Sequence, residues 1–167
     1  VGFVPMFGAT VAAADLFDHF PSFKQRQDWF ISHRPHLIDT VAPMLTPGAS
    51  GDVLLGLVRE DQLRRMLHYM LDEDEFLSPY GVRAVSRYHA DHPVAIALGD
   101  QEYQLDYEPG ESTTDLFGGN SNWRGPIWFP LNFLIVEALE RYHHFYGDAL
   151  TIDVPGSGAV TLQRAAD

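Results

Sequence analysis

The chain contains no cysteine, which excludes disulfide bonds and thiolate metal sites. Basic residues are also scarce, because 11 Lys and Arg stand against 23 Asp and Glu, a formal net charge of −12. This balance disfavours nucleic acid and anionic membranes as partners, since phosphate binding needs clustered basic side chains. No apolar run reaches the length of a membrane span, and no signal-peptide pattern opens the sequence. These absences favour a cytoplasmic protein whose substrate is neutral or only locally charged.

The common cofactor and nucleophile motifs are missing as well. The sequence has no GxGxxG or Walker pattern for a nucleotide, no GxSxG around a serine nucleophile and no HExxH for zinc. Its eight histidines are scattered, without Cys partners or a carboxylate at a fixed spacing. Histidines at the surface or at helix ends explain this pattern better than a zinc site does. We therefore expect neither a cofactor nor a metal ion.

The length of 167 residues corresponds to about one domain. With 46% hydrophobic and 20% charged residues, the chain is expected to fold rather than stay disordered. The sequence begins at Val1 inside an apolar segment and stops at Asp167 after TLQRAAD, which is typical of an amphipathic helix just beginning. We therefore expect residues 1–167 to be one partial domain, cut from a longer protein at both ends.

The spacing of apolar residues predicts a mostly α fold. Intervals of three and four indicate helices over 4–20, 22–34, 60–71 and 126–146, and a helical stretch that follows the turn at 78–81 and reaches 89. In the second helix Ser22 is a candidate N-cap, and Phe23, Trp29 and Phe30 are expected to face inward. Residues 94–107 alternate around a Gly-Asp pair instead, which predicts one small inserted β-hairpin.

Two groups of carboxylates are candidates for chemistry. The acidic run at 72–75 (DEDE) could help to bind a cation, but such runs are usually solvated surface, which is the favoured interpretation. Glu108, Glu111 and Asp115 lie on the long loop before residue 118. Hydrolysis of a glycosidic bond needs two carboxyl groups facing each other, about 6.5–9.5 Å apart in an inverting enzyme. One loop could supply a single partner or only polar contacts to hydroxyl groups, and an exposed loop acid is the more common case.

Residues 118–128 read GGNSNWRGPIW, the most informative segment of the chain. Trp123 offers a broad flat face and Arg124 a planar fork of donors, while the glycines and asparagines allow tight turns. A flat apolar face beside fixed donors suits a sugar ring, which has C–H faces and hydroxyl edges. The segment also fits a capped helix start, with Ser121 or Asn122 as the cap and Pro126 in the first turn. Both interpretations hold if Trp123 and Arg124 lie on the loop that the cap anchors.

Three segments together resemble glycoside hydrolase family 63, which includes processing α-glucosidases and mannosylglycerate hydrolases. They are DEDEFLSPYGVRAVSRYH (72–89), YEPGESTT (107–114) and GGNSNWRGPIWFPLNFLIVEAL (118–139), and RYHHFYGD (141–148) continues the similarity. The resemblance covers most of the chain and is nearest to long bacterial members, which makes a bacterial cytoplasmic protein the expectation.

The resemblance implies an (α/α)6 barrel, a ring of six helical hairpins whose pocket is lined by the loops at one end. It also implies hydrolysis of an α-glucosidic or similar α-glycosidic bond with inversion, by one general acid and one general base. In the family these are an Asp expected before Val1 and a Glu expected after Asp167, and neither motif is found in this chain. The chain would hold one wall of the active site and be inactive alone, with a glycoside and the remainder of the catalytic domain as partners.

The same resemblance assigns the site residues. Trp123 and Arg124 would line the subsite for the released sugar, Gly125 and Pro126 would shape the loop, and Trp128 would face the pocket or the barrel wall. Neighbouring side chains would add hydrogen bonds or stacking. The candidate substrate-binding residues are thus Tyr80, Asn120, Asn122, Trp123, Arg124 and Trp128, with Glu111 and Asp115 as weaker candidates.

Two other function classes stay open. A carbohydrate-binding or scaffold protein without catalysis would use the same aromatic pocket, and the missing acid and base favour it. A plain helical interaction domain would use the Trp motif only for packing, with Trp123 and Arg124 buried away from any cavity.

Overall fold

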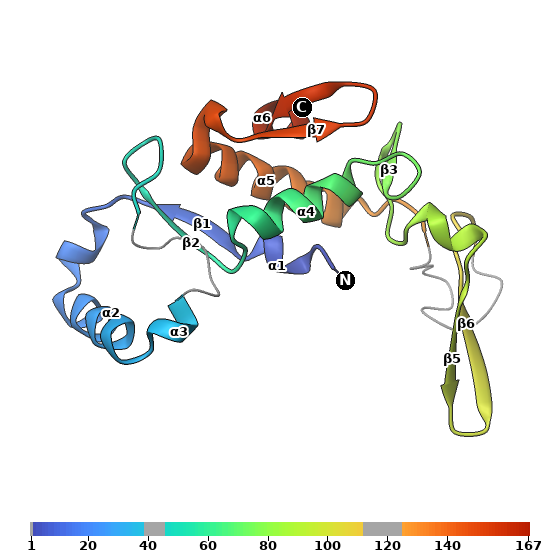
Figure 1. The fold of residues 1–167 in the computed structure, drawn as a ribbon, viewed down its shortest axis with the longest axis horizontal. Helices are drawn as coiled ribbons and strands as arrows, with labels where there is room; N and C mark the ends of the chain where they lie inside the picture. Colours follow the sequence, from blue (N-terminus) through green and yellow to red (C-terminus); the bar gives the residue numbers. More distant parts are fainter. Residues whose placement is uncertain (1, 39–45, 112–124) are drawn as a thin grey trace. The chain divides into compact units, whose positions relative to one another are not determined.

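The computed structural model describes residues 2–38, 46–111 and 125–167. These ranges contain six α-helices, three short 3₁₀ helices and eight strands, which Figure 1 traces along the chain. The chain divides into two compact units. Unit 1 comprises Val1–Met66, Leu134–Asp153 and Ser157–Asp167, and unit 2 comprises Leu67–Phe133 and Val154–Gly156.

The expected mostly α fold is wrong for this chain. The strands pair two by two in four small sheets, β1–β2, β3–β4, β5–β6 and β7–β8, which alternate with the helices along the sequence. Residues 2–38, 46–111 and 125–167 therefore do not form a clear (α/α)6 barrel. The physical reason is that short apolar segments have ambiguous periodicity, and the segments at 9–12 and 53–56 pair as strands with Ala9, Val53 and Leu54 buried.

The first segment of unit 1 differs most from its expected structure. Instead of one helix over 4–20 it forms α1 (Val4–Phe7), strand β1 (Ala9–Ala12) and the 3₁₀ helix η1 (Leu16–His19). Strand β1 pairs antiparallel with β2 (Val53–Gly56), with Ala9 opposite Gly56. A strand partner far along the chain thus overrides the local helical spacing.

Helix α2 (Pro21–His33) forms as predicted, and α3 (Pro35–Ile38) follows it. The aromatic side chains of α2 do not face inward, however, because no residue of this helix is buried and Trp29 is 54% exposed. Phe23 and Phe30 are exposed as well. The N-cap position falls on Phe20 and makes no side-chain hydrogen bond, so Ser22 is not the cap. Periodicity identified this helix but not which of its sides would be covered.

Two longer helices, α4 (Glu60–Met70) and α5 (Phe129–Tyr146), contribute to both units. The spacing predicts an apolar face of Leu63, Met66, Leu67 and Met70 on α4; three of these four residues are fully buried, and Met66 is half-buried. Within unit 1, arginines tie the helices to strands: Arg64 Nη1 donates to Thr151 O (2.6 Å) and Arg141 Nη1 donates to Ala9 O (3.1 Å). The buried side chains of unit 1 include Met6, Leu54, Leu63, Leu139, Tyr142, Phe145 and Leu162.

The loop at 46–52 packs against the last turn of α5. Ala49 N donates to Phe145 O (2.7 Å), and His144 Nε2 bonds Asp52 Oδ2 (3.0 Å). The His144 bond is the main reason why the pKa of the Asp52 carboxyl lies below its usual range, and the Ser50 hydroxyl lowers it further. Gly147, which follows α5, has the left-handed φ of +62° that suits a helix C-terminus.

The C-terminal part of the chain forms η3 (Gly147–Ala149), β7 (Thr151–Val154), β8 (Gly158–Thr161) and α6 (Leu162–Ala166), which belong to unit 1 except for Val154 at the end of β7. The helix expected to begin in TLQRAAD is therefore confirmed. Its N-cap is Thr161, whose hydroxyl accepts a hydrogen bond from Arg164 N (3.2 Å).

The described residues of unit 2 form two hairpins. The short one consists of β3 (Leu77–Ser78) and β4 (Gly81–Val82), and the 3₁₀ helix η2 (Arg87–Ala90) follows it, so the helical stretch expected here is wrong. The long one pairs β5 (Val94–Leu98) with β6 (Gln101–Leu105), as the alternating pattern predicted. All residues of β5 are exposed.

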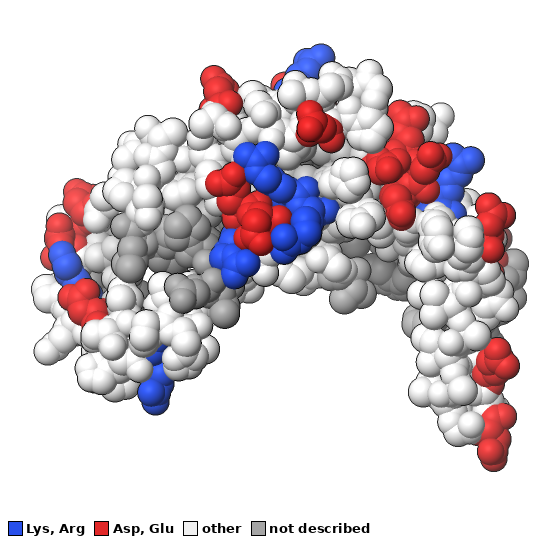
Figure 2. All heavy atoms as spheres, viewed as in Figure 1, with Lys and Arg blue, Asp and Glu red and all other residues white. Residues whose placement is uncertain are grey.

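Charged side chains are distributed unevenly over these elements. On α4 acidic and basic groups alternate as ion pairs, among them Arg64–Glu60 and Arg65–Asp61, and Figure 2 shows them as adjoining red and blue patches. Along the visible face of the β5–β6 hairpin only acidic groups interrupt the uncharged surface (Figure 2).

Candidate functional site

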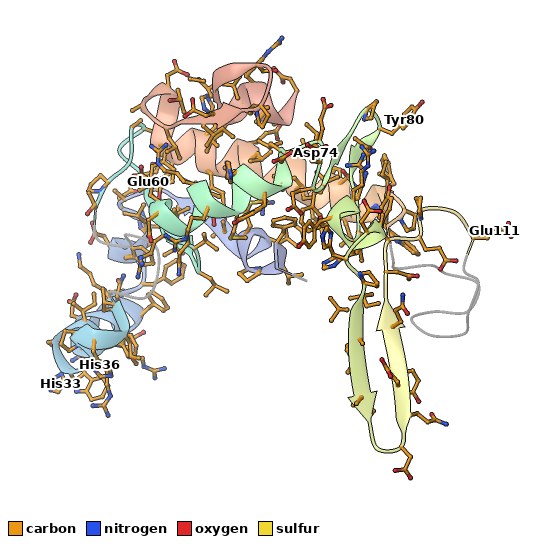
Figure 3. All side chains as sticks on the ribbon, turned by 45° about the vertical axis from the view of Figure 1, so that its right-hand side comes forward. His33, His36, Glu60, Asp74, Tyr80 and Glu111 are labelled. Atoms are coloured by element: carbon orange, nitrogen blue, oxygen red, sulfur yellow. The ribbon has the colours of Figure 1, made fainter. Side chains whose placement is uncertain are left out.

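The turn between β3 and β4 presents an exposed aromatic ring on a fixed backbone. Tyr80 is 86% exposed, and Figure 3 shows its side chain projecting away from the hairpin. The Ser78 hydroxyl holds the turn from inside, because it accepts from Tyr80 N (3.2 Å) and donates to Gly81 O (2.7 Å). Gly81 has a φ of +127°, a conformation that L side chains rarely adopt. The sequence SPYG therefore specifies a rigid turn with its tyrosine displayed to solvent.

One side chain of α5 joins this turn to the segment after the Trp motif. Asn132 Oδ1 accepts from Val82 N (2.7 Å), and Asn132 Nδ2 donates to Val82 O (3.0 Å). The same Nδ2 also donates to Trp128 O (3.0 Å), one turn earlier on the chain. The amide thus forms hydrogen bonds with both the N–H and the C=O group of Val82 in β4, as a neighbouring strand would.

Residues 125–128, which directly follow Trp123 and Arg124, are paired with the segment after the turn. Ile127 forms an antiparallel bridge with Arg83, and Ala84 N donates to Pro126 O (3.1 Å). Gly125 is buried, with a φ of +143°. A Cβ at that position would lie 2.6 Å from ring carbons of Tyr107, so the ring packs directly on the glycine backbone.

Arg83 organises the acidic run on the other side of the turn. Its guanidinium donates to the backbone oxygens of Glu73 (3.1 Å), Glu75 (3.4 Å) and Leu77, and its Cζ lies 6.0 Å from the centroid of the Tyr107 ring. This distance is within the range of a cation–π contact. Arg83 therefore connects the acidic run with the Tyr107–Gly125 packing.

The acidic run itself is partly structural rather than only solvated surface. The Glu75 carboxylate accepts a hydrogen bond from the Ser86 hydroxyl, and Asp72 Oδ1 accepts from Asp74 N (2.9 Å). Glu73 and Asp74 are exposed, and Figure 3 labels Asp74. In the described part of the chain, no group of three or more His, Cys, Asp and Glu residues could hold a metal ion.

The structure places only some of the candidate substrate-binding residues. Tyr80 is exposed, Trp128 is half-buried, and Glu111 is exposed on the segment that leaves β6. Figure 3 shows Tyr80 and Glu111 well apart, so these two side chains do not converge. The other candidates, Asn120, Asn122, Trp123, Arg124 and Asp115, lie outside the described residues.

Three residues that the sequence patterns did not single out hold this region together: Arg83, Tyr107 and Asn132. A signal existed for Asn132, since it is the only polar residue between Trp128 and Glu137. An asparagine in an apolar helical run needs partners for its amide. Arg83 and Tyr107 carry no comparable local signal, because an arginine and a tyrosine in a mixed polar segment are common at a protein surface.

Together these contacts bring three segments into one unit: the acidic run with the SPYG turn, the end of β6, and the start of α5. The segments present an exposed tyrosine, Tyr80, and a half-buried tryptophan, Trp128, together with backbone groups that hydrogen bonds hold in place. Aromatic rings with fixed polar groups are suited to binding a ligand that has both apolar faces and hydroxyl groups.

No helix among the described residues is both long and apolar enough to span a membrane.

Comparisons with known proteins identify relatives of this chain. The chain is 45% identical over 160 residues to an uncharacterised protein of Saccharomyces cerevisiae. The aligned residues are 95% of this chain and 15% of that protein. It is 31% identical over 89 residues to a protein of Schizosaccharomyces pombe named probable mannosyl-oligosaccharide glucosidase, covering 52% of the chain and 8% of that protein. The chain thus spans a small fraction of the length of these relatives, and no solved structure matches it.

A family profile matches almost the whole chain. The profile of the mannosylglycerate hydrolase MGH1-like glycoside hydrolase domain aligns with residues 13–164. The resemblance to this group of glycoside hydrolases, seen first in the 72–89 and 118–139 segments, is confirmed. The chain therefore belongs to the MGH1-like glycoside hydrolase domain family.

Proposed function

We propose that this chain forms the sugar-binding part of a glycoside hydrolase that cleaves an α-glucosidic or similar α-glycosidic bond with inversion. The family match over residues 13–164 supports the hydrolase class, and the similarity to a protein named as a glucosidase supports glucose as the sugar. The substrate would be an oligosaccharide or a smaller glycoside.

The observation that carries the proposal is the convergence of the three resembling segments in unit 2. Asn132 binds Val82, Ile127 bridges Arg83, and Tyr107 packs on Gly125. The segment that directly follows Trp123 and Arg124 in the sequence is therefore bonded to the chain directly after the hairpin that displays Tyr80. The rings of Tyr80 and Trp123 would stack on the C–H face of a sugar, and the Arg124 guanidinium would bind the hydroxyl groups of the sugar.

The two catalytic carboxyl groups are proposed to lie in parts of the full-length protein that precede Val1 and follow Asp167. The small share of the relatives' length that this chain spans is consistent with that arrangement. Asn120, Asn122 and Trp128 would add contacts to the sugar, and Glu111 and Asp115 would be secondary contacts to hydroxyl groups.

The test uses the full-length protein that contains this chain and four probes. These are p-nitrophenyl α-D-glucoside, p-nitrophenyl α-D-mannoside, an α-glucosyl disaccharide and mannosylglycerate. Trp123→Ala and Arg124→Ala should each lower kcat/KM for the hydrolysed probe by about 100-fold or more, because misplaced substrate loses effective concentration at the reacting groups. Proton NMR of the first product should show the β anomer, which is the result of inversion.

The matched control is Trp29→Ala, which also replaces a tryptophan with alanine, but on the exposed helix α2 of unit 1. Its kcat/KM should stay close to wild type. Equal effects of Trp29→Ala and Trp123→Ala would contradict the assigned role. Binding of a probe without any hydrolysis would instead favour a carbohydrate-binding protein without catalysis.

A further inference from the structure

Asn132 makes more specific bonds than the start of a helix requires. Its side chain is half-buried within the apolar run of α5, and both ends of its amide are used. Oδ1 accepts from Val82 N (2.7 Å), while Nδ2 donates to Val82 O (3.0 Å) and to Trp128 O (3.0 Å). A single side chain thus bonds the backbone of Val82, 50 positions earlier in the chain, and also the backbone of Trp128.

The turn that carries Tyr80 is shaped to accept this amide. A Cβ on Gly81 would lie 2.6 Å from Asn132 Oδ1, which is closer than real Cβ contacts allow. Glycine at position 81 therefore serves two needs, the φ of +127° and the close approach of the Asn132 oxygen. A side chain at position 81 would therefore have to displace the Asn132 amide.

The result is a ring that is exposed although its backbone is held from two sides. The Ser78 hydroxyl holds the turn from within, and Asn132 holds β4 immediately after it. A ligand that stacks on Tyr80 then has only the side chain left to order, so less conformational entropy is lost on binding. Fixing a binding group through supporting hydrogen bonds is a general requirement of precise sites.

We infer that Asn132 is a positioning residue, which sets the turn that carries Tyr80 in register with Trp128. This inference rests on the proposed function, because it assigns Tyr80 to the sugar. Asn132 itself need not touch the substrate, since it acts through the backbone of Val82 on one side and of Trp128 on the other.

The experiment is a double-mutant cycle in the full-length protein, with whichever of the four probes above the wild type hydrolyses fastest. The variants are Asn132→Asp, Asn132→Ala, Tyr80→Ala and the double variant Tyr80→Ala/Asn132→Asp. Asn132→Asp keeps the acceptor for Val82 N but replaces the donor with an anionic oxygen that faces two carbonyl groups. It serves as the second variant if Asn132→Ala does not fold.

We expect Asn132→Asp to raise KM about tenfold, which corresponds to about 1.4 kcal/mol, and to leave kcat within about twofold of wild type. In the Tyr80→Ala background the same substitution should change KM by less than twofold, because the ring that Asn132 positions is already gone. A purely structural role would instead reduce the folded fraction, which lowers apparent kcat and leaves KM unchanged.

The matched control is Arg141→Gln. It removes another side-chain bond to a distant backbone oxygen, that of Arg141 to Ala9 O in unit 1, and should not raise KM. An unchanged KM in Asn132→Asp, or additive effects of the Tyr80 and Asn132 substitutions, would overturn the inference while the proposed function stands. A wild type that neither hydrolyses nor binds any of the four probes would overturn both together.

Discussion

Gly125 is the position where a single added methyl group should disturb the candidate site most. The residue is buried, and its φ of +143° is rarely adopted by any L side chain. A Cβ built there would lie 2.6 Å from Cδ2 and Cε2 of Tyr107 and 3.4 Å from Glu108 N. Gly125→Ala therefore combines backbone strain with a steric clash.

Both contributions can be estimated. Backbone strain of this kind costs about 1–3 kcal/mol, and overpacking a filled site costs about 1–3 kcal/mol more. Tyr107 is not free to move aside, because its ring lies beneath the Arg83 guanidinium and its N–H donates to His89 O (3.3 Å). The local structure should thus be destabilised by about 2–6 kcal/mol.

The assay is native-state hydrogen exchange of the full-length protein, followed by mass spectrometry of the peptides that cover residues 82–84. Ala84 N is bonded to Pro126 O, next to the substituted residue. A local loss of about 2–6 kcal/mol should lower the protection of these amides by about 30-fold to 10⁴-fold.

Gly99→Ala is the control, because Gly99 has a φ of +65° and open space around its missing Cβ. It should leave protection at 82–84 unchanged. Protection in Gly125→Ala within threefold of wild type would refute the argument from the Tyr107 contact.

Three further predictions concern unit 1. Gly48→Ala should reduce hydrogen-exchange protection of the loop at 46–52, because the added Cβ would lie 2.5 Å from Phe145 Cδ2 and overpacking costs about 1–3 kcal/mol. Unchanged protection of this loop would contradict the prediction. The buried hydroxyl of Tyr142 has no hydrogen-bond partner among the described residues, and burial raises the pKa of this hydroxyl. Tyr142→Phe should therefore leave the free energy of unfolding unchanged or raise it by about 1 kcal/mol. A clear fall in Tm would contradict this prediction. The Arg59 guanidinium lowers the pKa of Asp61 from 3.8 to about 2, so the carboxylate stabilises the fold above about pH 4 and this contribution disappears as pH falls to about 2. A difference in Tm between wild type and Asp61→Asn that persists below pH 2 would contradict that assignment.

Local sequence patterns predicted the elements whose partners are near in the chain. The stripe of Leu63, Leu67 and Met70 specified α4, and the alternation around Gly99 and Asp100 specified the β5–β6 hairpin. Both depend on side chains a few residues apart, which helical and strand periodicity describe directly.

The same reasoning failed where the partner is distant. The apolar residues at 4–20 have helical spacing, yet Ala9–Ala12 form a strand because β2, more than forty residues later, is available to pair with them. The aromatic face of α2 was expected to be covered, and no residue of that helix is buried. Periodicity states that a helix has an apolar side, but it does not state what lies against that side.

For the candidate site the division is similar. The sequence by itself determined the family and the turn at 78–81, and it is the basis of the proposal that the 118–128 segment binds a sugar, because each of these depends on the residue types within a short segment. Only the tertiary structure decided that Asn132 would hold Val82, that Tyr107 would pack on Gly125 and that Arg83 would bind the acidic run. These contacts join segments that are 10 to 50 residues apart, and the packing of unit 2 as a whole, rather than any local preference, selects their partners.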